Sequence, residues 1–143
     1  MAEVKQFATF YLDKLLFVVE VAKVQEVIRY QEMTRVPLAS SVVTGLINLR
    51  GQIVTALDLR RRLDLADRAA ERLPMNVVVR TGEEAVSLLV DEIGDVVEVE
   101  DQTFEAPPET LQGVGRELIR GAYKLKDRLL LVLDTEKTVQ LAA

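Results

Sequence analysis

The sequence predicts an all-β protein made of two similar small subdomains. Valine accounts for 21 of the 143 residues and is concentrated in short runs bounded by turn-forming or charged residues, a pattern typical of strands. Helix signals are few and short. An internal repeat divides the chain into two comparable units. Strands of this length and spacing are typical of barrels or a sandwich and not of alternating strands and helices.

Ten runs have the composition of strands. The expected strands are Phe7–Leu12, Leu15–Val21, Val24–Arg29, Leu46–Leu49, Ile53–Leu57, Val77–Arg80, Ala85–Val90, Val96–Val99, Ile119–Leu125 and Leu129–Leu133. The first two are joined by a tight turn at Asp13-Lys14. Asp58 and Asp134 are each placed to cap a short helix, over residues 59–63 and 135–141.

The repeat is read from two collinear matches. Gly45–Asp58 superposes on Gly121–Asp134 without a gap, 76 positions apart, and upstream residues match at an offset of 69. Each copy reads glycine, strand, two-residue turn, strand, aspartate, short helix. Neither half is large enough to bury an adequate core alone, so we expect one shared hydrophobic core. The expected division is a first subdomain at about 5–65, a linker at about 64–74 and a second subdomain at about 75–139.

Composition excludes several classes of function. The chain has no cysteine and no histidine, which removes thiol and Ser-His-Asp nucleophiles and zinc sites of the Cys/His type. Residues 1–72 carry 11 basic and 9 acidic side chains, whereas residues 73–143 carry 7 and 14, giving nets of +2 and −7. The acidic half would repel nucleic acid, so no nucleic-acid partner is expected. That half is either a solvated face or a docking face for a basic partner.

Neither a membrane span nor an export signal is expected. No apolar run reaches the roughly 18 residues that a bilayer span needs, and the first residues lack the apolar core of a signal peptide. We therefore expect a cytoplasmic protein without direct membrane insertion.

No catalytic, metal or cofactor site is expected. The carboxylates Asp91-Glu92-Asp95 and Glu98-Glu100-Asp101 lie in strand context, where adjacent side chains point to opposite faces. Gly113-Val-Gly115 lacks the rest of a phosphate-binding motif, and we expect a flexible loop there. Arg60-Arg61-Arg62 is interpreted as a solvated basic face, the alternatives being contact with nucleic acid or acidic lipid.

Three segments remain as candidate binding surfaces. The first is the hairpin tip Asn48-Leu-Arg-Gly51, and the second is the strand Val24-Gln-Glu-Val27, where Glu26 could pair with a nearby arginine. The third is the loop at Pro107-Pro108-Glu109, because two prolines favour a rigid extended backbone. A solvated turn or a simple strand terminator is the alternative at each.

These segments carry a resemblance to a known family. The string Gly45-Leu-Ile-Asn-Leu-Arg-Gly51 followed by Asp58-Leu-Arg60 resembles the signature of CheW, the bacterial chemotaxis coupling protein family. The other matching segments, in the family's order, are Val24–Val27, Leu88–Asp91, Val96–Val99, Pro107-Pro108, Ile119–Gly121 and Leu129–Asp134. The likeness runs from about Phe7 to Val139, so the chain is read as a single CheW-like domain.

The resemblance implies two SH3-like five-stranded β-barrels around a common hydrophobic core, with short helices. It implies a non-enzymatic adaptor, without cofactors, that links the cytoplasmic tips of methyl-accepting chemoreceptors to the regulatory domain of the histidine kinase CheA. It also implies recruitment to membrane-associated receptor arrays and possible rings with the kinase or with other copies. The implied receptor-binding residues are Val24, Glu26, Asn48, Arg50, Gly51 and Val77, with Glu26 and Arg50 as an ion pair. The implied kinase-binding residues are Gly45, Ile53, Pro108 and Glu109.

Three positions depart from the family's pattern. The Asp13-Lys14 turn is tighter than usual, Thr55 replaces a common proline, and Asp127 replaces a common glycine. None of them removes a residue implied for receptor binding. Two other classes stay open as alternatives: a regulatory domain that binds a kinase without receptors, and an enzyme.

Overall fold

The structure is a computed structural model that describes residues 4–37, 39–82, 84–100, 104–107, 113–125 and 128–140, without the side chain of Val114. Its strands are β1 (Val4–Leu12), β2 (Leu15–Glu20), β3 (Val24–Ile28), β4 (Val43–Leu49), β5 (Gln52–Asp58), β6 (Met75–Thr81), β7 (Glu84–Val90), β8 (Glu92–Glu100), β9 (Phe104–Glu105), β10 (Ile119–Leu125) and β11 (Arg128–Leu133). Its helices are the 3₁₀ turn η1 (Val21–Lys23), α1 (Leu59–Arg62), α2 (Val114–Leu118) and α3 (Thr135–Val139).

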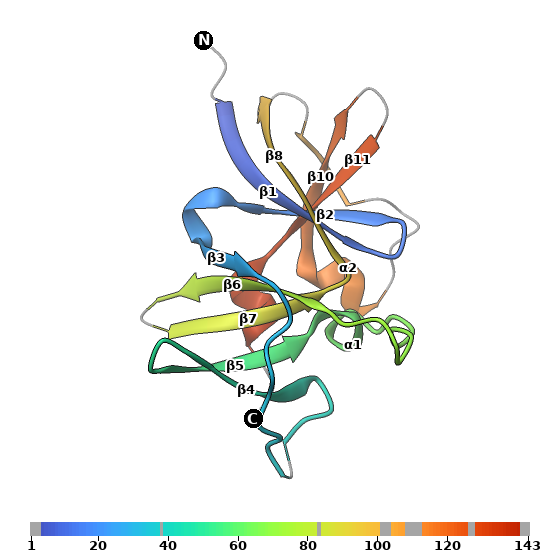
Figure 1. The fold of residues 1–143 in the computed structure, drawn as a ribbon. Helices are drawn as coiled ribbons and strands as arrows, with labels where there is room; N and C mark the ends of the chain where they lie inside the picture. The colour runs from blue at the N-terminus through green and yellow to red at the C-terminus, as the bar shows by residue number, and fades with distance from the viewer. Residues whose placement is uncertain are drawn as a thin grey trace.

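The strands form two sheets, which confirms the predicted all-β class. Sheet A has the order β8-β1-β2-β11-β10-β9, and sheet B has the order β3-β6-β7-β5-β4. Each of the ten expected strands matches one of these elements, but β2 and β3 end one residue before the expected ends at Val21 and Arg29; the two-residue strand β9 was not expected and gives sheet A a sixth strand. The helices lie near the junction between the two sheets (Figure 1). None of the helices in the described part of the chain has the length and hydropathy of a membrane-spanning segment.

The two repeat units exchange strands. β3 follows β2 in the chain but pairs with β6, and β8 follows β7 but pairs with β1. The second strand of each repeat hairpin then pairs in parallel with a strand of the sheet it joins, β5 with β7 and β11 with β2 (Figure 1). Apart from β9, the two sheets therefore have the same order of equivalent strands. Each sheet contains strands from before and from after the 64–74 segment. The strands that flank this segment, β5 and β6, both belong to sheet B, so the chain does not pass from one sheet to the other there.

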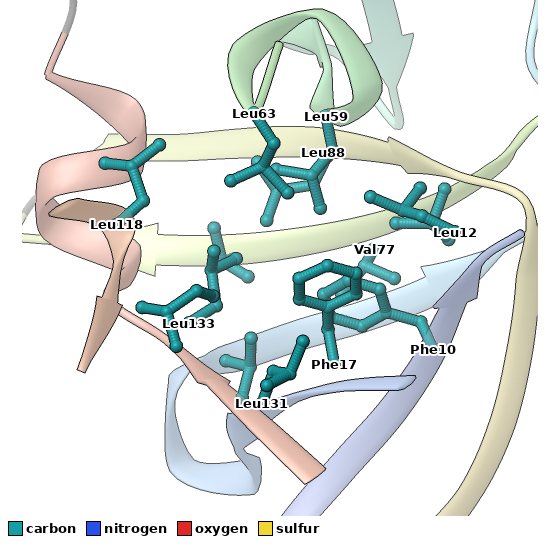
Figure 2. Packing of buried hydrophobic residues seen from close by; sticks show 14 of the residues in the cluster. Phe10, Leu12, Phe17, Leu59, Leu63, Val77, Leu88, Leu118, Leu131 and Leu133 are labelled. Carbon is teal, nitrogen blue, oxygen red and sulfur yellow. The ribbon is translucent and has the colours of Figure 1, made fainter. Parts of the chain in front are cut away.

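One large apolar cluster lies between the sheets. It contains Phe10 and Phe17 of sheet A, whose stacked rings are 5.8 Å apart, together with Val77 and Leu88 of sheet B (Figure 2). Side chains of α1 and α2, including Leu59, close the cluster (Figure 2). Each sheet also buries a smaller cluster on its other face. The expected shared core is thus present, and both sheets contribute to it.

A buried ion-pair network joins the two sheets beside this core. Asp91 lies between β7 of sheet B and β8 of sheet A and is 3% exposed. Its carboxylate accepts two hydrogen bonds from the Arg60 guanidinium, one of them 2.9 Å from Nε to Oδ1, and one from Arg68 Nε at 2.7 Å. The backbone N–H of Asp13, in the β1–β2 turn, donates to the same carboxylate at 2.7 Å, and the Asp13 carboxylate accepts from Arg60 Nη2 at 2.6 Å.

These contacts determine the charge state of Asp91. Burial favours the neutral acid, but the hydrogen bonds from Arg60, Asp13 and Arg68 outweigh it and hold the pKa of Asp91 well below its usual range. The hydrogen bond to Asp91 also raises the pKa of Arg60, against the opposing effect of desolvation. Asp91 is therefore a structural anion whose oxygens are occupied by arginines.

The network corrects the interpretation of Arg60-Arg61-Arg62 as a solvated face. Arg60 is only 5% exposed, and Arg62 donates to the carbonyls of Thr138, Lys137 and Gln140 at the end of α3 at 2.7, 2.8 and 3.0 Å. The side chain of Arg61 alone is substantially exposed, at 45%. The interpretation as a solvated face is wrong for Arg60 and Arg62, because α1 lies where the two halves of the chain meet.

The helices agree only in part with the local sequence signals. Asp58 caps α1 by accepting from the N–H of Arg60, and Asp134 caps α3 by accepting from that of Lys137, as predicted. The expected flexible loop at Gly113–Gly115 is wrong, because residues 114–118 form α2. Leu118 of this helix packs into the shared core, a long-range contact that the glycine spacing does not encode.

We predict that residues 1–72 do not fold alone. This fragment contains β1–β5 but lacks β6, β7, β8 and β11, so all its strands except β4 lose a neighbour and the shared core loses most of one side. Thermal denaturation of the fragment should show no cooperative transition, and its amide NMR signals should be poorly dispersed. The full chain should show a cooperative transition and dispersed amide signals. A cooperative transition in the fragment would contradict the shared-core account.

We predict that Asp91→Asn destabilises the protein by about 3 kcal/mol at pH 7, because Arg60 and Arg68 lose their buried counter-charge. The folded-state pKa of Asp91 is lowered, so its contribution is fully present above the unfolded-state pKa of about 3.9 and is lost as the pH falls further. The difference in free energy of unfolding between the variant and the parent protein, measured by urea denaturation, should therefore become smaller below about pH 4. Glu92→Gln, at a mostly exposed ion pair with Arg72, is the control and should cost less than about 1 kcal/mol.

Candidate functional site

The tip of the β4–β5 hairpin carries the first of the candidate residues. Leu49 pairs with Gln52, which leaves Arg50 and Gly51 as a two-residue turn with positive φ values of 52° and 89°. Turns with two left-handed residues match the twist of the flanking strands, and glycine favours the second position. The Asn48 side chain accepts from the N–H of Gly51 at 2.9 Å. The asparagine and the glycine therefore set the shape of the turn that presents Arg50.

Arg50 forms an ion pair with Glu26. Its Nη1 and Nη2 atoms donate to the two Glu26 carboxylate oxygens at 3.1 and 3.4 Å. The Glu26 side chain is 17% exposed, but that of Arg50 remains 82% exposed. Glu26 lies on β3 and Arg50 directly follows β4, and these are the two edge strands of sheet B, so the pair links the two edges of this sheet. Most donors of the guanidinium remain accessible from solvent.

A bulge in β3 decides which way Glu26 points. Val24 lies opposite Val79, whereas Glu26 lies opposite Val78, so Gln25 is an extra residue in the pairing. Val79 faces the shared core and Val78 faces the interior of the sheet B barrel. Val24 and Glu26 are therefore on opposite faces of β3, although strict alternation would place them on the same face.

The residues implied for receptor binding are only partly brought together. Glu26, Arg50 and the turn residues Asn48 and Gly51 form one cluster at the edge of sheet B. Val24 packs against the shared core with its side chain partly buried. Val77 is 1% exposed in that core, so its side chain is not part of the protein surface. We define the edge site as Glu26, Asn48, Arg50 and Gly51.

The residues implied for kinase binding differ in accessibility. Ile53 is 61% exposed on β5, directly opposite Asn48. Gly45 is buried, and a Cβ atom there would lie 2.7 Å from the carbonyl oxygen of Thr34, which pairs with β4. Pro108 and Glu109 lie outside the described residues.

The internal repeat shows why a glycine is needed at position 45. Gly121, the counterpart of Gly45, is covered in the same way by β9, and a Cβ atom there would lie 2.5 Å from the carbonyl oxygen of Glu105. In both sheets the glycine makes room for a chain segment that crosses closely over the hairpin. The conformation of the hairpin thus accounts for both residues before any partner is considered.

Val27, the last residue of the candidate segment Val24–Val27, has a partly exposed side chain. Val27 follows Glu26 on the edge strand and is 39% exposed, and Tyr30 a few residues later is 36% exposed. A β-branched residue on a strand is expected to be buried, and only the edge position of β3 exposes it. Because Val27 pairs with Val77 and Glu26 pairs with Val78, Val27 lies on the opposite face of β3 from Glu26, and its side chain adds apolar surface to the same sheet edge outside the edge site.

Comparisons with known proteins show the family and the fold of the chain. The CheW-like domain family model matches residues 6–143. The chain is 28% identical over 136 residues to the chemotaxis protein CheW of Treponema pallidum, covering 92% of this chain and 80% of that protein. It is 29% identical over 136 residues to the chemotaxis protein CheW of Bacillus subtilis, covering 93% and 87%. The crystal structure of the scaffolding protein TtCheW from Thermoanaerobacter tengcongensis superposes with a TM-score of 0.82 at 24% identity, covering 93% of this chain and 89% of that one.

We predict that Arg50→Ala changes the free energy of unfolding by no more than about 0.5 kcal/mol, since the arginine is mostly exposed. Gly45→Ala on the same hairpin should cost about 1–3 kcal/mol, because the new methyl group collides with the backbone at Thr34. Urea denaturation of the two variants measures both values. A large loss in Arg50→Ala would mean that the ion pair supports the fold.

Proposed function

Because the chain belongs to the CheW family of chemotaxis adaptors, we propose that its edge site binds the cytoplasmic tip of a chemoreceptor. The protein is a non-enzymatic scaffold that couples receptors to the kinase CheA, in keeping with the family. The observation that carries the proposal is the Arg50–Glu26 pair. Glu26 holds the guanidinium in one orientation while 82% of the arginine side chain stays accessible to a partner.

The pair suits recognition for a physical reason. A guanidinium held by one carboxylate keeps further N–H donors in a fixed plane for carbonyl or carboxylate groups of a partner. Val27 exposes apolar surface on the other face of the same edge strand. Of the other residues implied by the resemblance, Val24 and Val77 would act through the position of β3 beside β6, because neither side chain is well exposed.

For the kinase, we propose Ile53 as a direct contact and Gly45 as an indirect one. Ile53 exposes a large apolar side chain, a common feature of interface centres. Gly45 allows the segment at Thr34 to cross the hairpin, so its effect on a partner would come through that segment. The loop at Pro108 and Glu109 remains a second proposed kinase contact, based on the resemblance. The protein would act in the cytoplasm, recruited to receptor arrays.

We predict that Arg50→Ala lowers receptor-tip binding and receptor-dependent CheA activation by about tenfold, without a loss of thermal stability. Arg50→Lys should not restore activity fully, since lysine lacks the planar donor set. If the pair acts as one unit, the double variant Arg50→Ala with Glu26→Ala should lose less receptor binding and kinase activation than the sum of the losses in the two single variants. Arg120→Ala, an exposed arginine on β10 of sheet A, is the control. Retained receptor binding in Arg50→Ala, or kinase activation without receptors, would contradict the proposal.

A further inference from the structure

A groove of about 310 Å³ lies on sheet A, whereas the edge site lies on sheet B. It forms where the β1–β2 turn meets the start of β11, because β11 pairs in parallel with β2. We call it the basic groove. Its lining residues are Tyr11, Lys14, Leu15, Leu16, Arg128, Leu129 and Leu131.

The floor of the basic groove is apolar and partly exposed. Leu15 is 37% exposed and Leu129 is 39% exposed, while Leu131 beneath them is buried. The equivalent positions in sheet B, at the repeat offset of 69, are Glu84 for Leu15 and Arg80 for Tyr11. Since sheet B forms the same arrangement with polar residues at these two positions, the fold itself does not require apolar side chains there; the counterpart of Leu129, at the hairpin offset of 76, is Ile53, which is apolar and 61% exposed.

The rim of the basic groove is positively charged, and its charges are not neutralised by the described part of the chain. Lys14 and Arg128 are exposed, and neither forms an ion pair with a described residue. The nearby acidic groups are engaged elsewhere: Asp13 binds Arg60 at 2.6 Å, and Glu92, which pairs with Tyr11 across the sheet, binds Arg72 at 2.9 Å. By contrast, Arg50 and the arginines of α1 have partners within the chain.

We propose that the basic groove is a second docking site, for an acidic segment of another protein that carries an apolar side chain between carboxylates. The apolar side chain would lie between Leu15 and Leu129 and lose its contact with water. The carboxylates would lie at Lys14 and Arg128, where a potential of opposite sign attracts them. The site is on sheet A, so it can be occupied together with the edge site on sheet B.

The test is an NMR titration of the full chain with a synthetic decapeptide that alternates glutamate and leucine. We expect saturable amide shifts confined to Leu15, Leu129 and their neighbours, with a Kd below about 1 mM that weakens as salt is added. Decapeptides that alternate lysine with leucine, or glutamate with serine, should bind at least about tenfold more weakly, since each lacks one half of the required chemistry. Shifts located elsewhere, equal binding of all three peptides, or binding of anionic lipid vesicles without peptide binding would overturn the proposal.

Variants separate this site from the edge site. We expect the affinity for the glutamate–leucine peptide to fall about tenfold in Leu129→Ser, and about tenfold in the double variant Lys14→Glu with Arg128→Glu. Val96→Ser and Arg120→Glu, at an exposed valine and an exposed arginine of the same sheet, are the matched controls and should leave binding unchanged. Circular dichroism and thermal unfolding check that each variant is folded. Receptor-tip binding should be retained in the groove variants, and unchanged peptide binding in them would overturn the groove assignment while leaving the proposal for Arg50 intact.

Discussion

The ion pair between Asp91 and Arg60 holds the two sheets together at the place where the chain passes from one to the other. Asp91 lies between β7 of sheet B and β8 of sheet A, and its carboxylate is shared by Arg60, Arg68 and the Asp13 backbone. A buried carboxylate is stable only when such partners replace water. The network thus fixes the β1–β2 turn, helix α1 and the segment after it in one arrangement.

Each repeat unit passes from one sheet to the other at β3 or at β8, so neither barrel can form from one unit alone. Each sheet combines the first two strands of one repeat unit with the later strands of the other, so the apolar cluster between the sheets contains residues from both halves of the sequence. A unit of about 70 residues buries too little surface to be stable alone, and the exchange removes that limit by forming one core instead of two. Because the core is common, the edge site on sheet B and the basic groove on sheet A keep a fixed relation to each other.

Arginines have three different roles in this protein, and their surroundings decide between them. Arg60 is buried and neutralises Asp91, Arg50 is exposed but oriented by Glu26, and Arg128 is exposed without an ion-pair partner in the described chain. The first is a structural residue because its removal would leave an unpaired buried charge. The other two can contact a partner at little cost to the fold, which is the property that an adaptor needs at its surface.

The sequence by itself determined the elements that depend on near neighbours. Alternating β-branched runs located the strands, and the aspartates Asp58 and Asp134 located two helix starts. The resemblance to CheW added the Arg50–Glu26 pair. Only the tertiary structure decided that β3 and β8 exchange sheets, that Arg60 is buried and that Val77 faces the core, because strand partners and burial depend on segments far apart in the chain and local spacing carries no record of them.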